Sequence, residues 1–172
     1  DHRSLETELS AELASANDPE TRRARLNAFK DREMFRADMR HILGYVTEFG
    51  QFSNELTNVA RVVVMSGYRI CRTELEVHYG IPQKSNGQSC QFSICALGKC
   101  GGRELGFASD VELMFIYEEV GHTTGPQSIT NTEFFLKLVE SFTHSIRAKR
   151  AGIFEIDLRL RPYGRAGSLA VS

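Results

Sequence analysis

Two carboxylates, Asp110 and Glu112, stand one residue apart at the start of an apolar run that extends to Tyr117. Alternate side chains of a β-strand project from the same face, so this spacing would bring the two carboxylates together. Adjacent like charges are costly unless a cation neutralises them, and oxygen ligands suit a hard divalent ion such as Mg²⁺. The pair therefore predicts a magnesium site at the beginning of a strand.

A glycine-rich turn lies between an apolar run over 90–97 and this carboxylate pair. Its centre is Gly101-Gly102. Glycine allows the backbone to lie close to phosphate groups, whose charge backbone N–H groups can balance. The surrounding residues do not complete the G-x-x-x-x-G-K-[ST] pattern of a P-loop. The turn and the carboxylates together predict a different kind of phosphate-and-magnesium site.

A third carboxylate, Asp157, lies in a stretch over 153–161 where apolar and charged residues alternate. Alternation of this kind predicts a half-buried strand. If this strand lies beside that of Asp110, three carboxylates share one face and could hold two Mg²⁺ ions for phosphoryl or nucleotidyl transfer. Arg159 and Arg161 follow on the same polar face and could contact phosphate in a bidentate manner.

Each of these features also has an ordinary structural explanation. A carboxylate pair at a strand edge is usually solvated or salt-bridged, and Gly-Gly is usually a turn. Arg159 and Arg161 could simply pair with Glu155 and Asp157 on an exposed sheet face. The order of the parts favours the functional interpretation: strand, Gly-Gly turn, carboxylate pair, helix, and a strand with a third carboxylate.

The elements that must position these residues fall into two parts, and we expect an α+β fold. Residues 1–82 are predicted to form a helical region of about three helices, one of them beginning at Asp18-Pro19. Residues 83–172 are predicted to form the core that carries the site. Within that core we expect loops over 83–89 and 121–127, strands over 90–97, 111–117, 153–161 and 168–172, and a helix over 131–150 opened by Thr130 and Glu133 and terminated by Gly152. The chain stops on a strand, so we expect it to be truncated at its carboxyl terminus.

Composition narrows the classes of partner. The chain has 172 residues, a formal net charge of −1 and 25% charged residues, so no global basic field favours nucleic acid. No apolar run approaches the roughly 20 residues that span a bilayer, and the polar start is not a secretory signal. Four cysteines are present without a zinc-ligand spacing. We expect a cytoplasmic protein that binds neither nucleic acid nor membrane.

Two segments resemble the glutamine synthetase adenylyltransferase family. They are LGKCGGRELGFASDVEL over 97–113 and IDLRLRPYG over 156–164, and 26–34 and 131–135 also resemble segments of that family. The resemblance implies a DNA polymerase β-like nucleotidyltransferase fold. It also implies that Asp110, Glu112 and Asp157 are the catalytic, metal-binding carboxylates. Gly101, Gly102 and Ser109 would form the phosphate loop.

The same resemblance implies an activity. Members of the family carry two such domains: one attaches AMP from ATP to a tyrosine of glutamine synthetase, and the other removes it with phosphate, releasing ADP. This chain is more similar to the amino-terminal, deadenylylating half. The implied partners are glutamine synthetase, ATP or ADP, phosphate and a nitrogen-regulatory signal protein, and the implied role is regulation of nitrogen assimilation.

One position departs from the family pattern, which usually has aspartate where this chain has Glu112. The longer side chain can still offer an oxygen, but it moves the ligand by about 1 Å, and such misplacement can cost on the order of a hundredfold in rate. A second hypothesis is therefore a catalytically silent regulatory domain that binds a nucleotide or a partner protein. A third, a nucleotidyltransferase acting on RNA, is disfavoured by the near-neutral charge.

Overall fold

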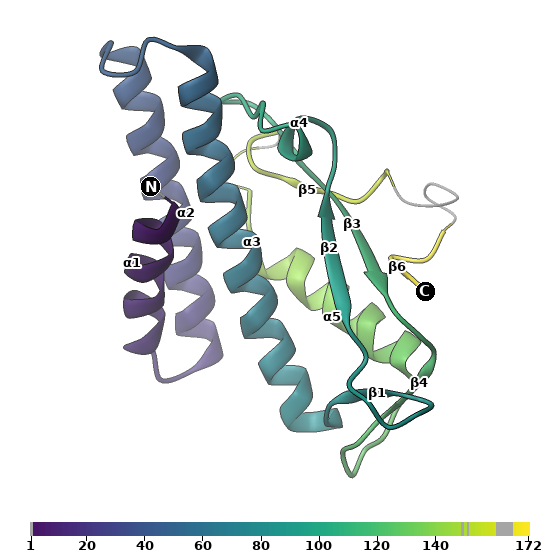
Figure 1. Cartoon of the computed structure of the whole chain (residues 1–172). Coiled ribbons are helices and arrows are strands. Elements are labelled where there is room, and N and C mark those ends of the chain that lie inside the picture. Colours follow the sequence, from purple (N-terminus) through teal and green to yellow (C-terminus); the bar gives the residue numbers. More distant parts are fainter. Residues whose placement is uncertain (1, 149, 151, 161–166) are drawn as a thin grey trace.

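Three amino-terminal helices, two further helices and two small sheets, joined by short connections, make up the described part of the chain in the computed structural model (Figure 1). The structure describes residues 2–148, 150, 152–160 and 167–172. In chain order the elements are α1 (His2–Ala14), α2 (Pro19–Ile42), α3 (Phe49–Tyr79), β1 (Pro82–Lys84), β2 (Phe92–Ala96), α4 (Gly98–Gly101), β3 (Val111–Tyr117), β4 (Gly121–Thr123), α5 (Asn131–Ser145), β5 (Ile156–Asp157) and β6 (Ala170–Val171). The expected α+β class is confirmed.

The helical region contains α1, α2 and α3, which pack side by side (Figure 1). The predicted start of α2 is confirmed: Asp18 is the N-cap, its Oδ1 accepts a hydrogen bond of 2.8 Å from the Thr21 amide, and Pro19 takes the first helical position. The α2–α3 contact is apolar, with Leu26, Phe29 and Val63 fully buried. Burial of these side chains, rather than helix propensity, holds the three helices together.

Strand β3 is the centre of the main sheet. It pairs antiparallel with β2 and parallel with the short strands β5 and β6, while β1 and β4 form a separate antiparallel pair. The ring of Phe92 on β2 stacks against Tyr68 of α3 and Phe135 of α5. Both helices therefore cover the same face of the sheet (Figure 1). These two helices do not cover the opposite face of the sheet.

The predicted helix over 131–150 is five residues too long. Its start is right, because Thr130 Oγ1 accepts a hydrogen bond from the Glu133 amide. The helix ends at Ser145, where Asn27 of α2 donates to the Ser145 carbonyl and accepts from the Arg147 amide, each at 2.8 Å. A tertiary contact thus ends the helix before Gly152, which local sequence rules cannot anticipate.

The predicted strand over 153–161 is reduced to the two residues of β5. Phe154 interrupts the extended backbone with a positive φ of 55°, and its ring is buried. Leu160, expected on the same buried side, is 52% exposed. The alternation of residue types was therefore a poor guide to strand length here, because one buried aromatic side chain fixes a non-extended backbone.

Two strands arise where loops were expected. β1 lies in the predicted loop over 83–89 and β4 in the one over 121–127, and Gln83 pairs with His122. The side chain of Asn131, fully buried, donates to the backbone carbonyls of Gln83 and Glu119. The Asn131 amide of α5 therefore joins β1 to the segment that leads into β4.

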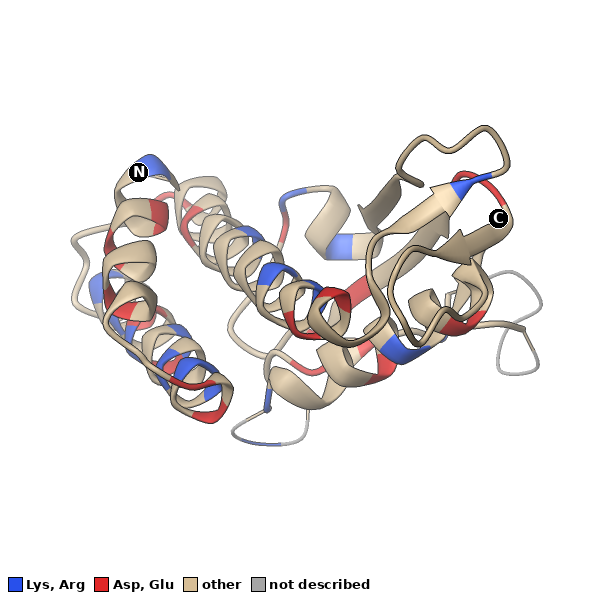
Figure 2. Cartoon of the chain, turned by 90° about the horizontal axis from the view of Figure 1, so that it is seen from below, with Lys and Arg blue, Asp and Glu red and all other residues tan. Residues whose placement is uncertain are grey.

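Charged residues of both signs are interspersed along the helices (Figure 2). None of the described helices is long and apolar enough to cross a membrane. The proposed division at residue 82 stays a prediction, since α3 packs against the neighbouring helices and also against α5.

One buried acid makes stability depend on pH. Asp38 of α2 is 7% exposed, and its Oδ1 has no hydrogen-bond partner among the described residues. Burial raises the pKa of this carboxyl to about 6, although the charge of His41 opposes the shift. The folded protein therefore keeps the proton of Asp38 between about pH 4 and 6, where an unfolded chain has already lost it.

We predict that Asp38→Asn stabilises the protein at pH 7.5, by up to about 3 kcal/mol, because the amide carries no buried charge. The free energy of unfolding of the parent chain should fall as pH rises from 4 to 6 relative to that of the variant. Urea unfolding at pH 4.0 and 7.5 measures both, with the exposed Glu48→Gln as control. An equal stability difference at the two pH values would contradict the prediction.

Candidate functional site

The register of β3 and β5 places two of the predicted carboxylates side by side. The strands are parallel, and Glu112 is the direct partner of Asp157. Asp110 lies two residues before Glu112, while Val111 and Leu113 between and after them are buried against the helices. Residues in direct register and residues two apart share a face of the sheet. Asp110, Glu112 and Asp157 therefore lie on the face that the helices leave open.

Asp110 carries a buried oxygen with no partner. Its Oδ1 makes no hydrogen bond among the described residues, although the atom is inaccessible to solvent. Asp110 also lines a cavity of about 580 Å³, together with Asp157, Arg159 and Leu169. Buried polar atoms are nearly always satisfied, so an orphan oxygen beside a cavity indicates a missing donor or cation.

Asp157 is held by Arg159. The Arg159 Nε lies 3.0 and 2.8 Å from the two carboxylate oxygens, its Nη2 is 2.6 Å from Oδ2, and its amide donates to Oδ1 at 2.8 Å. The Asp157 side chain is 9% exposed, whereas that of Arg159 is 63% exposed. This is a bidentate, charge-assisted ion pair in which the Asp157 carboxylate is buried and the Arg159 guanidinium is largely exposed to solvent.

The charge of Arg159 acts on all three carboxylates. The pKa of Arg159 is raised, chiefly by the hydrogen bond and charge of Asp157 and further by the charges of Asp110 and Glu112. One guanidinium thus balances a cluster that would otherwise repel itself. Among the described residues, no three His, Cys, Asp or Glu side chains are arranged to hold a metal ion together. Arg159 is the cationic side chain that pairs with Asp157.

Glu112 owes its position to a glycine that the sequence reasoning did not single out. The Glu112 carboxylate lies against the backbone of Gly98, where a Cβ would overlap Oε2, and Gly98 has a positive φ of 50°. The backbone carbonyl of Glu112 accepts a hydrogen bond of 2.9 Å from Leu97. A side chain at 98 would strain the positive φ and would make the Glu112 carboxylate shift.

The two predicted phosphate-loop glycines differ from each other. A Cβ on Gly101 would lie 2.5 Å from the Ala96 carbonyl oxygen, so Gly101 is needed for close packing of α4 on β2. A Cβ on Gly102 would approach no atom closer than 3.5 Å, and its φ is −76°. Gly102 is exposed, and nothing in its surroundings requires glycine.

Ser109 is buried and closes a turn. Its Oγ accepts a hydrogen bond of 3.0 Å from the Gly106 amide, and its carbonyl accepts one of 3.1 Å from Phe154. These bonds tie the segment before Asp110 to the segment before Asp157. The phosphate-binding role of Ser109 stays a prediction. Arg161, the remaining predicted site residue, lies outside the described residues.

The helical region anchors the segment that leads into β5. Lys30 of α2 is 1% exposed, donates to the Arg147 carbonyl and lies 5.5 Å from the ring centre of Phe154. Asn27, one turn earlier, binds the backbone on both sides of residue 146. A buried ammonium group needs such partners to offset its lost hydration. These contacts fix the approach to Asp157, and sequence patterns alone gave no signal for them.

We predict that Gly98→Ala lowers the free energy of unfolding by about 2 kcal/mol or more. The added methyl group would strain the positive φ and displace the Glu112 carboxylate. Gly102→Ala is the matched control and should leave stability unchanged or raise it by about 0.5–1 kcal/mol. Urea unfolding of the two variants provides the test. Equal stability of both would show that Glu112 does not rest on Gly98.

Comparison with known proteins identifies the family of the chain. The family model described as glutamate-ammonia ligase adenylyltransferase matches residues 1–172. Proteins named bifunctional glutamine synthetase adenylyltransferase/adenylyl-removing enzyme are similar to the chain: one from Shewanella loihica is 34% identical over 98% of this chain and 18% of its own length. One from Aromatoleum aromaticum is 31% identical over 98% and 20%, and one from Nitrosomonas eutropha is 38% identical over 79% and 14%.

The chain spans about a fifth of the length of the first two of these relatives. The match to the family nevertheless extends over every residue of the chain, including both segments that carry the carboxylates. The chain therefore belongs to the glutamate-ammonia ligase adenylyltransferase family.

Proposed function

We propose that this chain is a magnesium-dependent nucleotidyltransferase domain of the DNA polymerase β-like fold, acting on the AMP–tyrosine linkage of glutamine synthetase. The observation that carries the proposal is the parallel register of Glu112 with Asp157, with Asp110 on the same face. Membership of the family supplies the class of reaction, and relatives named for both adenylylation and adenylyl removal supply the substrate.

The residues present fit a magnesium site in their donor chemistry. All three side chains offer carboxylate oxygens, which Mg²⁺ prefers, and Asp110 Oδ1 is buried without a partner. Asp110, Glu112 and Asp157 would hold the ion or ions. Bound there, magnesium would balance phosphate charge and lower the pKa of an attacking oxygen.

Arg159 has to change partners for the site to work. Its side chain is mostly in solvent and is joined to the site only at Asp157 among the three carboxylates. A guanidinium presents a planar pair of N–H donors that matches phosphate as well as carboxylate. We propose that Arg159 moves from Asp157 to a substrate phosphate, so the same side chain first pairs with Asp157 and then helps to orient the nucleotide.

The chemistry needs no nucleophilic side chain from this chain. In phosphorolysis, an oxygen of inorganic phosphate forms a bond to the phosphorus of AMP, the bond from that phosphorus to the tyrosine oxygen breaks, and the phenolate takes up a proton. The products are ADP and the unmodified tyrosine side chain of glutamine synthetase. Catalysis of this kind consists mostly of positioning and charge stabilisation. Three carboxylates fixed by a strand register and a guanidinium are suited to both tasks.

The removal of AMP, rather than its attachment, is our preferred direction because of the similarity of segments 26–34 and 131–135 to the amino-terminal half of the family. The alternative is a catalytically silent domain that binds nucleotide or a partner protein through the same face. One observation favours that alternative: the chain has Glu112 where the family usually has aspartate.

We predict that Asp110→Asn and Asp157→Asn each lower AMP release by at least about a hundredfold, because each removes a charge from the metal-binding cluster. Adenylylated glutamine synthetase would be incubated with the chain, phosphate and Mg²⁺, and ADP measured. Glu48→Gln, an exposed carboxylate distant in sequence from the site, should keep full activity. Circular dichroism would verify folding of each variant.

The outcomes separate the two candidate functions. Formation of ADP by the parent chain but not by the two aspartate variants supports catalysis. If the parent chain forms no ADP, the catalytic proposal is wrong. Calorimetric titration with ADP then tests the silent alternative, which requires nucleotide binding that does not depend on Mg²⁺. Equal activity of the parent chain and Asp110→Asn would remove these carboxylates from the mechanism.

A further inference from the structure

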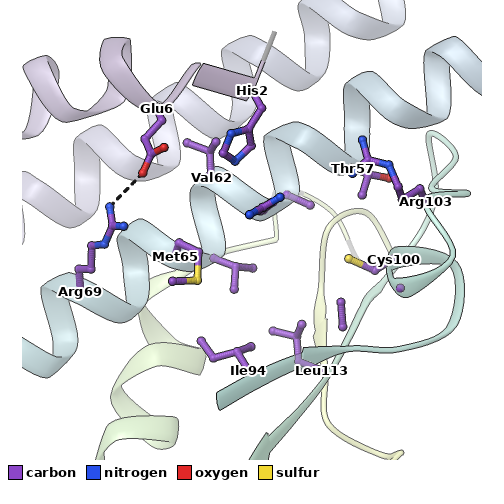
Figure 3. A pocket seen from close by; sticks show the side chains of 15 residues that line it. His2, Glu6, Thr57, Val62, Met65, Arg69, Ile94, Cys100, Arg103 and Leu113 are labelled. Carbon is purple, nitrogen blue, oxygen red and sulfur yellow. Dashed lines mark hydrogen bonds and ion pairs between the residues drawn. The ribbon is translucent and has the colours of Figure 1, made fainter. Parts of the chain in front are cut away.

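A second cavity, of about 550 Å³, lies between the helical region and the sheet (Figure 3). Residues of α1 and α3 form one side, and residues of β2, β3 and α4 form the other. Its volume is in the range of small-molecule sites. None of the three site carboxylates lines it. It is therefore separate from the site of the proposed reaction.

One part of this cavity is apolar. Ile94 and Ala96 of β2 and Leu113 of β3 line it from the sheet, and Val64 and Met65 line it from α3 (Figure 3). Met65 is 36% exposed, and Ala96 is also open to solvent. A ligand with an apolar body would remove this surface from water, which is favourable in proportion to the area covered.

The charged groups of the cavity are predominantly positive. Arg61, Arg69 and Arg103 line it, against one carboxylate, that of Glu6, which lies 3.2 Å from Arg69 (Figure 3). The exposed side chain of Arg61 makes no ion pair or hydrogen bond with any residue that the structure describes. Two guanidinium charges are therefore left without a carboxylate partner, and an anion would complement them.

Arg103 has a strained backbone, and two amide side chains hold its guanidinium at the cavity. Its φ is 59°, a left-handed value that is unfavourable for any residue with a Cβ. Its Nε donates to Asn54 Oδ1 at 2.8 Å and its Nη2 to Asn58 Oδ1 at 3.0 Å, both on α3. These partners orient the guanidinium and leave its charge intact. Strained residues of this kind persist where the surroundings fix them and often mark functional positions.

We propose that this cavity binds a small organic anion, one that joins a carboxylate, sulfonate or phosphate group to an apolar or aromatic body. The anionic group lies between Arg61 and Arg103, and the apolar body lies against Ile94 and Leu113. Cys100 and Gly101 also line the cavity, so the ligand contacts α4, the same helix whose Gly98 packs against Glu112. This proposal goes beyond the proposed function and does not depend on it.

The test uses 8-anilinonaphthalene-1-sulfonate, an aromatic sulfonate whose fluorescence rises on binding, with the 172-residue chain. We expect saturable binding that weakens between 50 and 500 mM NaCl, because salt screens the arginine charges. N-phenyl-1-naphthylamine has a similar apolar body without the sulfonate, and we expect it to bind about tenfold more weakly. Neither measurement requires enzymatic activity.

Three variants locate the binding site. Arg61→Gln and Arg103→Gly each remove one guanidinium and should weaken sulfonate binding about tenfold, the loss of one charge-assisted contact. Glycine at 103 also tolerates the positive φ, so that variant should fold. Ala96→Leu adds carbon atoms to the cavity without a charge change and should weaken both probes. Lys137→Gln removes one positive charge from α5, outside the cavity, and should bind both probes as the parent chain does.

The proposal is overturned by any of three results. These are no binding of the sulfonate to the parent chain, equal binding of the sulfonate and the uncharged amine, or unchanged sulfonate binding by both arginine variants. A fourth result would also overturn the proposal. If Lys137→Gln weakens binding as much as Arg61→Gln does, the effect comes from net charge and the cavity is not the binding site.

Discussion

The mutual repulsion of three carboxylates on one sheet face is the constraint on which the rest of this structure depends. Asp110, Glu112 and Asp157 are brought together by a register that the backbone enforces, so their charges cannot separate without breaking the β3–β5 pairing. A cation near these carboxylates reduces their repulsion. Arg159 fills this role at a small cost in conformational entropy, because it is two residues from Asp157 and binds both oxygens of that carboxylate.

The short length of β5 explains why so much of the molecule supports it. Two residues of pairing cannot hold a strand against carboxylate repulsion, because isolated strand pairs of that length are not stable in water. The approach to β5 is instead fixed from α2, by Asn27 and the buried Lys30, and from the loop before β3, by the Ser109 carbonyl. The helical region is thus part of the machinery that positions the site, although it contributes none of the three carboxylates.

Sequence patterns predicted the parts of the fold that are set locally. The apolar run over 111–117 gave β3 with its observed bounds, and Asp18 and Thr130 marked the starts of α2 and α5, because caps and short apolar runs depend on neighbouring residues. The end of α5 depends on Asn27, and the length of β5 depends on Phe154. The placement of β1 and β4 depends in part on Asn131. The effects of these three come from contacts distant in sequence, so no local rule could reveal them.

In the candidate site, too, some features could be predicted from neighbouring residues and others depend on contacts distant in sequence. Spacing predicted that Asp110 and Glu112 share a face, and the strand pattern brought in Asp157, but the importance of Gly98 follows only from where the Glu112 carboxylate lies. At the position where the family usually has aspartate, the Glu112 carboxylate lies against the backbone of Gly98. Gly98 and Glu112 therefore form one structural unit. The glycine before the Gly-Gly pair, rather than Gly102, is the residue that this carboxylate requires.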